Sequence, residues 1–168
     1  GVVPPVAKVD NPEILLTERV SGAGRFVWVV NNTMLPLDPG QAWRVCLIMS
    51  QRMPVVSGIM TPPDGYVAYD IFSLRQVTPP VNADLRSLPA RLFALLPKLI
   101  AQVSLVVPKA ATAGKEFTYR VWVQDNQGRA INASLPVRVH LVASNGSVLA
   151  EQWTAAFYKE GVQGKFTM

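Results

Sequence analysis

Prolines and glycines divide this chain into short segments more strongly than any other feature of its sequence. Fourteen prolines and eleven glycines are spread along 168 residues, and proline cannot donate the backbone hydrogen bond that a helix interior or a central strand requires. Short strands joined by turns accommodate this spacing, whereas a helix bundle does not. Pro, Gly or Arg also interrupts every apolar stretch well before the ~20 residues that a membrane-spanning helix needs. We therefore expect an all-β fold without a membrane span.

The composition is typical of a folded chain, because 49% of the residues are hydrophobic and only 16% are charged. Intrinsically disordered proteins combine low hydrophobicity with high net charge. A single cysteine, Cys46, excludes an intrachain disulfide and any zinc site built on cysteines. A single histidine, His140, excludes sites that need two histidine ligands. Cys46 alternates with Ile48 on one strand face, so we expect a buried, inert thiol rather than a nucleophile.

The net charge of +5 does not indicate a nucleic-acid-binding surface. Most of the Lys and Arg residues stand singly and are not clustered beside stacking aromatic residues, as such a surface requires. The chain begins with Gly1 and shows no charged segment followed by an apolar one, so no signal peptide is visible. A cleaved signal peptide, or a segment taken from a longer protein, would give the same start.

Apolar segments between residues 12 and 97 predict a first β-sandwich, after an extended, proline-rich lead-in at residues 1–11. The segment at residues 25–31 has apolar side chains on both faces, which is typical of a central strand. The segment at residues 90–96 could also form a short helix capped by Ser87, but a short apolar run bounded by prolines favours a closing strand. The predicted strands are residues 14–20, 25–31, 43–49, 55–60, 66–72 and 90–96.

Residues 98–101 form a predicted linker, and residues 102–168 a second, immunoglobulin-like β-sandwich. Asn145-Gly146 is a strong signal for a tight hairpin turn. An immunoglobulin-like sandwich has about seven strands in ~100 residues, and this segment supplies fewer. We therefore expect a module truncated at its C-terminus, in a chain that is a fragment of a longer protein. The predicted strands are residues 103–107, 117–123, 135–142, 147–153 and a last one that begins at 165.

The sequence contains no recognisable catalytic or metal-binding pattern. Its eleven carboxylates are not paired at one predicted cleft, as glycoside hydrolysis would need, and it lacks a phosphate-binding loop and a nucleophile elbow. Asp70, the only carboxylate within an apolar strand, is more simply explained as a hydrogen-bonded residue at a strand end. Asp125 to Gly128 resembles the opening of a calcium loop, but the later ligands are missing, which favours a plain turn. We expect a non-catalytic chain without a metal or other cofactor.

The candidate binding residues lie on outward faces of the second module. Trp122 shares its face with Arg120 and Gln124, opposite the apolar row that should enter the core. Arg138 and His140 occupy the equivalent polar face of another predicted strand. An aromatic ring among polar side chains can stack on a sugar, but Trp and Arg are also enriched at protein interfaces. The sequence favours a contact with a neighbouring domain or a partly buried Trp122, with a carbohydrate platform as the alternative.

Four segments of the first module carry a resemblance to a known group of proteins. Residues 25–32 (with Val-Val-Asn), 43–49, 68–72 (with Tyr-Asp) and 90–97 (Ala-Arg-Leu-Phe-Ala-Leu-Leu-Pro) follow one order. This order resembles the C-terminal accessory β-sandwich of large secreted bacterial proteins related to glycoside hydrolases of the β-galactosidase type. Residues 103–168 are similar to the immunoglobulin-like or macroglobulin-like domains that often follow, through residues 106–108, 113–115, 119–123 and 136–141 and the turn at Gly128.

The resemblance implies a structural, non-catalytic accessory role in an extracytoplasmic protein, secreted or periplasmic, whose catalytic domain lies outside this chain. The expected partners are neighbouring domains of the same parent protein and a polysaccharide. Two alternatives remain open. The chain could be a carbohydrate-binding module that uses an exposed Trp122, or a protein-interaction domain in which the strand near Lys165 leaves an open sheet edge for self-association.

Overall fold

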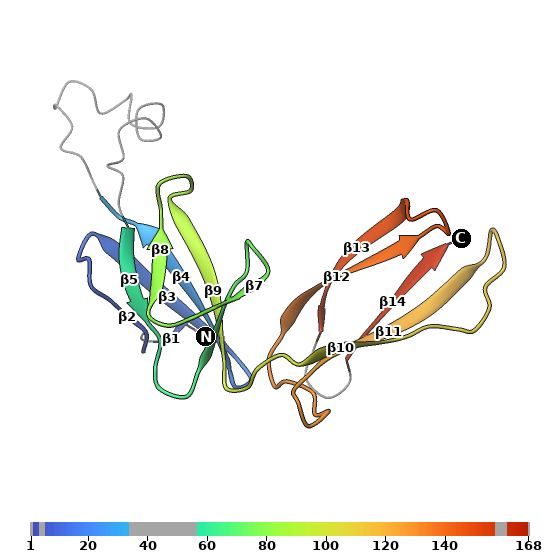
Figure 1. The fold of residues 1–168 in the computed structure, drawn as a ribbon, viewed down its shortest axis with the longest axis horizontal. Helices are drawn as coiled ribbons and strands as arrows, with labels where there is room; N and C mark the ends of the chain where they lie inside the picture. The colour runs from blue at the N-terminus through green and yellow to red at the C-terminus, as the bar shows by residue number, and fades with distance from the viewer. Residues whose placement is uncertain (1, 4–5, 34–56, 157–160, 168) are drawn as a thin grey trace, which may run out of the picture. The chain divides into compact units, whose positions relative to one another are not determined.

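The computed structural model describes residues 2–3, 6–33, 57–156 and 161–167, where the regular structure consists of antiparallel strands (Figure 1). In these ranges no helix is long and apolar enough to cross a membrane. The all-β class predicted from the sequence is confirmed. The strand predicted at residues 43–49, which contains Cys46, lies outside the described ranges.

The chain divides into two units, Gly1–Val20 with Arg25–Leu95 and Ser21–Gly24 with Leu96–Met168. The short turn between β3 (Ile14–Ser21) and β4 (Gly24–Asn31) therefore belongs to the second unit. The amide of Ala23 donates to the Asn132 carbonyl at 2.7 Å. The amide of Ser134 donates to the Ser21 hydroxyl at 3.1 Å. These two bonds hold the turn within the second unit.

The first unit is a two-layer β-sandwich. Its larger sheet has the strand order β1-β3-β4-β9-β6-β7, and its smaller sheet the order β2-β5-β8. The central position predicted for residues 25–31 is confirmed, because β4 lies between β3 and β9. The closing segment is the strand β9 rather than the alternative helix. The remaining bounds are β1 Val2–Val3, β2 Lys8–Val9, β5 Ser57–Thr61, β6 Val67–Asp70, β7 Arg75–Val77, β8 Val81–Asp84 and β9 Ala90–Leu96.

Alternation of side chains along the strands builds the core between these two sheets. Val27 and Val29 of β4 and Phe93 of β9 share one buried cluster with Met60 of β5 and Ala83 of β8. Each of the five is at most 2% exposed. The intervening residues of β4 point to the opposite face of the sheet and are half-buried. Removal of the inward row from water is the main favourable term for this unit.

The N-terminal segment differs from the extended lead-in that the sequence predicts. β1 pairs with β3, and β2 pairs with β5, so this segment adds one strand to each sheet. Ala7, between them, is buried in the core. The sequence pattern also predicts neither β7 nor β8, because alternation is hard to recognise in segments of three or four residues.

The second unit contains a three-stranded sheet, β10-β11-β14, and a two-stranded sheet, β12-β13. The inward residues of β11 are Tyr119, Val121 and Val123, each at most 7% exposed. The Tyr119 hydroxyl donates to Oε1 of Gln152 at 2.9 Å and so connects the two sheets. All five strands predicted here occur, with bounds β10 Gln102–Val106, β11 Glu116–Gln124, β12 Leu135–Val142, β13 Val148–Ala156 and β14 Val162–Thr167.

A buried carboxylate joins three parts of the first unit. Glu18 of β3 is 0% exposed, and its carboxylate accepts hydrogen bonds from the Val6 amide at 3.0 Å and from the Arg25 guanidinium. Nε of Arg25 also donates to the Tyr66 hydroxyl at 3.3 Å. These bonds to Tyr66 and Glu18 raise the pKa of Arg25, whose guanidinium is charged at physiological pH in any case. Arg25 therefore supplies the positive charge that a buried carboxylate needs.

Replacement of Arg25 by methionine should expose the cost of the unpaired charge on Glu18. We expect Arg25→Met to lower the free energy of unfolding by about 3 kcal/mol, at the lower end of the range for broken buried ion pairs, because 26% of the Arg25 side chain is exposed. Urea unfolding measures the change. Arg19→Met, at an exposed position of β3 next to Glu18, is the control and should stay within about 0.5 kcal/mol of the wild type. Equal losses in both variants would contradict the assignment.

Candidate binding surface

The hairpin of β12 and β13 presents the most exposed aromatic side chain of the described residues beside charged groups. Its turn runs from Ala143 to Gly146, where the Gly146 amide donates to the Ala143 carbonyl at 2.9 Å. The side chain of Asn145 accepts a hydrogen bond from the Ser147 amide at 3.0 Å, and Gly146 adopts a φ of +86°. The strand register places Arg138 opposite Trp153. Opposite residues share one face of a sheet, with Cβ atoms about 4.5–5.5 Å apart.

Four side chains make this outer face, which we call the hairpin platform: Arg138, His140, Glu151 and Trp153. The register also places His140 opposite Glu151, so the platform consists of two adjacent cross-strand pairs. Trp153 is 57% exposed. All four alternate with side chains that point to the other face, such as Gln152.

Polar contacts fix the orientation of the Trp153 indole. Its Nε1 donates to Oε1 of Glu151 at 2.8 Å, and the other carboxylate oxygen, Oε2, lies 2.9 Å from Nε2 of His140. The Arg138 guanidinium carbon lies over the ring, 5.4 Å from its centroid, within the range of a cation–π contact. The platform therefore combines an aromatic ring of fixed orientation with hydrogen-bonding groups of both charges.

Arg120 and Trp122 lie on the other sheet. Trp122 is opposite Ser104 of β10, and the Arg120 guanidinium lies 5.9 Å from the centroid of its ring. Trp122 is half-buried and packs against the backbone at Gly161, where an added Cβ would lie 2.7 Å from the indole. The outer faces of two sheets packed face to face point away from each other. The four residues predicted from the sequence are thus separated into two pairs, Arg120 with Trp122 and Arg138 with His140.

Sequence reasoning missed Trp153 and Glu151, although the signal was present. A two-residue turn at Asn145-Gly146 pairs Ser144 with Ser147, and counting back along both strands places Trp153 opposite Arg138. The structure has the same pairing of Trp153 with Arg138, but a different pairing next to the turn. Val142 pairs with Val148, and the pairing then shifts by one residue.

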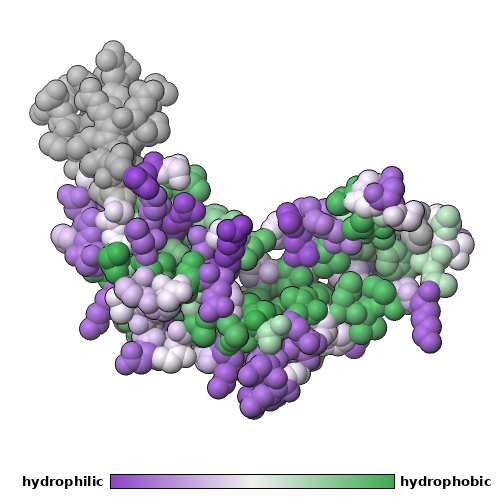
Figure 2. Space-filling model, viewed as in Figure 1, coloured by the Kyte–Doolittle hydropathy of each residue, from purple (hydrophilic) through white to green (hydrophobic). Residues whose placement is uncertain are grey.

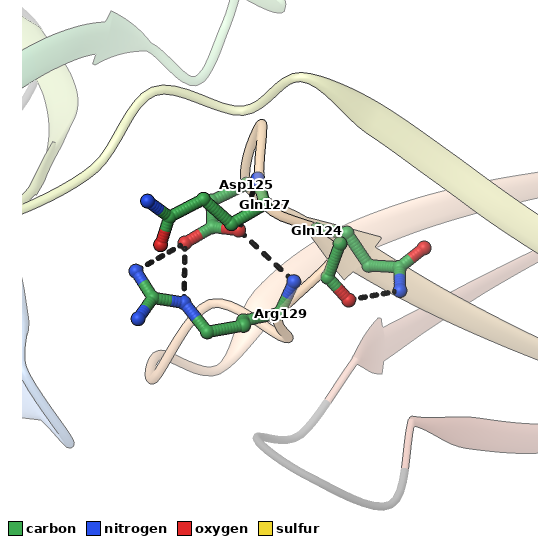
Figure 3. Close-up of polar contacts among 5 residues, drawn as sticks. Gln124, Asp125, Gln127 and Arg129 are labelled. Carbon is green, nitrogen blue, oxygen red and sulfur yellow. Dashed lines mark hydrogen bonds and ion pairs between the residues drawn. The ribbon is translucent and has the colours of Figure 1, made fainter.

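A second feature of this unit is a cleft of about 520 Å³ beside the β11–β12 connection. Its lining includes Asp125 and Arg129, drawn in Figure 3. Asp125 is 6% exposed. Its carboxylate accepts hydrogen bonds from the backbone amides of Gln127 and Arg129, both at 2.9 Å, and from the Arg129 guanidinium at 3.2 Å. The segment that resembles a calcium loop is therefore a turn whose carboxylate is occupied by protein donors.

The carboxylate of Asp70 also accepts hydrogen bonds from the backbone. Its Oδ1 accepts hydrogen bonds from the amides of Phe72 at 2.8 Å and Ser73 at 3.3 Å, and Arg91 lies 4.0 Å from Oδ2. This is the hydrogen-bonded strand end that the sequence favours over a catalytic role. In the described ranges, no three His, Cys, Asp or Glu side chains are grouped closely enough to hold a metal ion.

Comparisons of the chain with protein-family models, with curated proteins and with solved structures find no match. What the chain does must therefore be argued from its own side chains. Among the described residues, the hairpin platform has the arrangement best suited to bind a ligand, because Asp70 and Asp125 are engaged in turns.

The charge of Asp125 should stabilise the second unit in a pH-dependent way. Hydrogen bonds from the Arg129 amide, the Gln127 amide and the Arg129 guanidinium outweigh desolvation and hold the pKa of Asp125 below its usual value. This stabilisation is present above the unfolded-state pKa of about 3.9 and is lost as the pH falls through the lower folded-state pKa. Asp125→Asn should therefore melt at a lower temperature than wild type at neutral pH, and this difference should shrink in acid.

Thermal unfolding followed by circular dichroism at several pH values tests this expectation. Asp64→Asn, in an exposed turn of the first unit, is the matched control and should melt like the wild type. A deficit for Asp125→Asn that stays constant down to low pH would show that the carboxylate charge is not its cause.

Proposed function

We propose that this chain is a non-catalytic accessory region of a larger extracytoplasmic, glycoside-hydrolase-like protein, and that its second unit binds glycan through the hairpin platform. The observation that carries the proposal is the exposed, oriented indole of Trp153 between Arg138 and Glu151. The sequence resemblance described above supports the accessory role. It supplies strands and turns of an accessory sandwich and no catalytic residue.

The chemistry of the platform fits a sugar ring. A pyranose has an apolar face of C–H groups that can stack on an indole, and hydroxyls at its edge that need hydrogen-bond partners. Arg138 supplies only donors, whereas Glu151 supplies acceptors. A sugar ring stacked on Trp153 would have donors from Arg138, which lies opposite Trp153, and acceptors from Glu151, two residues away on the same strand.

The arrangement of the platform also limits the cost of binding. The bonds of Trp153 to Glu151 and of Glu151 to His140 already restrict these side chains. Binding to side chains that are held in place loses less conformational entropy than binding to free ones. The platform lies on paired strands rather than on a loop, so its backbone is held by the ladder of β12 and β13 as well.

The two tryptophans of the second unit provide a matched test. The test uses the oligosaccharide that binds the wild type most tightly. Trp153→Ala should raise its dissociation constant by about tenfold or more, because truncation of a central Trp in an interface costs about 2 kcal/mol or more and 1.4 kcal/mol corresponds to tenfold. Trp122→Ala, on the other sheet, should leave the affinity unchanged. Isothermal titration against a panel of plant and bacterial oligosaccharides measures both.

Two outcomes would overturn the proposal. One is loss of binding in Trp122→Ala but not in Trp153→Ala, which would move the site to the sheet of β11. The other is release of nitrophenol from an aryl galactoside by the purified chain, abolished by Asp70→Asn, which would make it an enzyme. Circular dichroism spectra equal to that of the wild type show that the variants are folded.

A further inference from the structure

The turn between β12 and β13 holds the only Asn-Gly pair in the sequence, Asn145-Gly146. Asn145, Gly146 and Ser147 are all exposed. Where Figure 1 draws this hairpin, Figure 2 shows hydrophilic and hydrophobic residues mixed at the surface. An asparagine side chain that is followed by glycine can lose its amide without an enzyme, because the next backbone nitrogen can attack the side-chain carbonyl. The turn is therefore a candidate site of covalent modification.

Gly146 is the residue type that hinders such an attack least. It has no Cβ, and an added Cβ would meet no atom of the rest of the chain within 4 Å. Its φ of +86° lies in the region that glycine adopts freely and other residues adopt rarely. The Gly146 nitrogen is therefore unhindered, and its backbone can turn toward the side chain of Asn145 at little conformational cost.

Two donors from Ser147 polarise the side-chain carbonyl of Asn145. Its Oδ1 accepts hydrogen bonds from the Ser147 amide at 3.0 Å and from the Ser147 hydroxyl at 2.8 Å. Negative charge develops on this oxygen when a nucleophile adds to the carbonyl carbon, and donors directed at such an oxygen stabilise the transition state. The fold of the turn thus supplies the two donors that the reaction needs.

Another hydrogen bond of the turn opposes the reaction. The Gly146 amide donates to the Ala143 carbonyl at 2.9 Å, and the nitrogen must lose this proton before it can attack. The Ala143 amide in turn donates to the Ser147 carbonyl at 2.8 Å. The bond from Gly146 must therefore break first, as local opening of an exposed turn allows.

We propose that Asn145 is a site of spontaneous covalent modification, in which the Gly146 nitrogen attacks the side-chain amide and water is the other reactant. The Gly146 nitrogen gives its proton to solvent and forms a bond to Cγ of Asn145. The bond from Cγ to Nδ2 then breaks, and Nδ2 takes up a proton and leaves as ammonia. The product is a five-membered succinimide ring that contains the Gly146 nitrogen.

Water opens this ring in one of two ways. Addition to the Cγ carbonyl breaks the bond from Cγ to the Gly146 nitrogen and leaves aspartate. Addition to the backbone carbonyl of Asn145 leaves isoaspartate, whose main chain runs through the former side chain. No group is oxidised or reduced, and in both products a carboxylate has replaced the neutral amide.

Either product changes the end of the hairpin. The new carboxylate lowers the net charge of the chain by one from +5. Isoaspartate also adds one methylene to the main chain, close to the register shift between Leu141 and Val142. The pair of Arg138 and Trp153 lies further along the ladder. The proposal does not rest on glycan binding, since its readout is the mass of a peptide.

Incubation of the full chain at mildly basic pH, followed by trypsin digestion and mass spectrometry, is the first experiment. Cleavage at Lys and Arg places Asn145 in the peptide of residues 139–159 and Asn126 in that of residues 121–129. Asn126 is the internal control, because it is also exposed in a turn but is followed by Gln127. We expect the first peptide to gain the mass of deamidation while the second stays unchanged. An intact Asn145, or equal conversion of both, would overturn the proposal.

The products identify the nucleophile. Attack by the Gly146 nitrogen gives isoaspartate together with aspartate, and chromatography separates the two forms of the peptide. Direct attack by water on the side-chain amide gives aspartate alone, and this result would overturn the part assigned to Gly146. Asn145→Gln should keep its peptide unmodified over the same period, because the longer side chain would have to close a six-membered ring.

The hydroxyl of Ser147 is tested by a pair of variants. Ser147→Ala should slow the conversion by about fivefold, which corresponds to about 1 kcal/mol, the net contribution of one hydrogen bond. Ser144→Ala, exposed in the same turn, is the matched control and should convert at the rate of the wild type. Equal rates in the two variants would overturn the part assigned to the Ser147 hydroxyl. Circular dichroism spectra equal to that of the wild type show that both variants are folded.

Discussion

The fold of each unit depends on burying the side chains on one face of its strands, while those on the other face stay at least partly exposed to solvent. Val27 and Val29 of β4 enter the core of the first unit, and Tyr119, Val121 and Val123 of β11 enter that of the second unit. Because successive side chains of a strand point to opposite faces, the same rule that builds the core sets the outward rows. The residues with candidate functions, Trp153 among them, belong to an outward row.

Two buried carboxylates are satisfied by protein partners, and this determines what they can do. Glu18 is neutralised by Arg25 and bonded to the Val6 amide, and Asp125 is surrounded by amide and guanidinium donors. A carboxylate held in this way stabilises the fold. The hairpin platform differs, because its polar groups are partly exposed and surround an aromatic ring. The candidate binding groups therefore lie on the outer face of a sheet.

Local patterns in the sequence determined the all-β class, the positions of most of the longer described strands and the core-facing residues of β11 and β12. The Asn145-Gly146 signal predicted the hairpin, but the register that places Trp153 opposite Arg138 also depends on a shift at Val142, which the sequence pattern does not show. Only the tertiary structure decided which sheet each strand joins. It put Trp122 on a different sheet from Arg138, gave strands to the N-terminal segment and left β10 at an edge. Alternation is a property of neighbouring residues, whereas sheet membership depends on pairing between segments far apart in the chain, which no short pattern records.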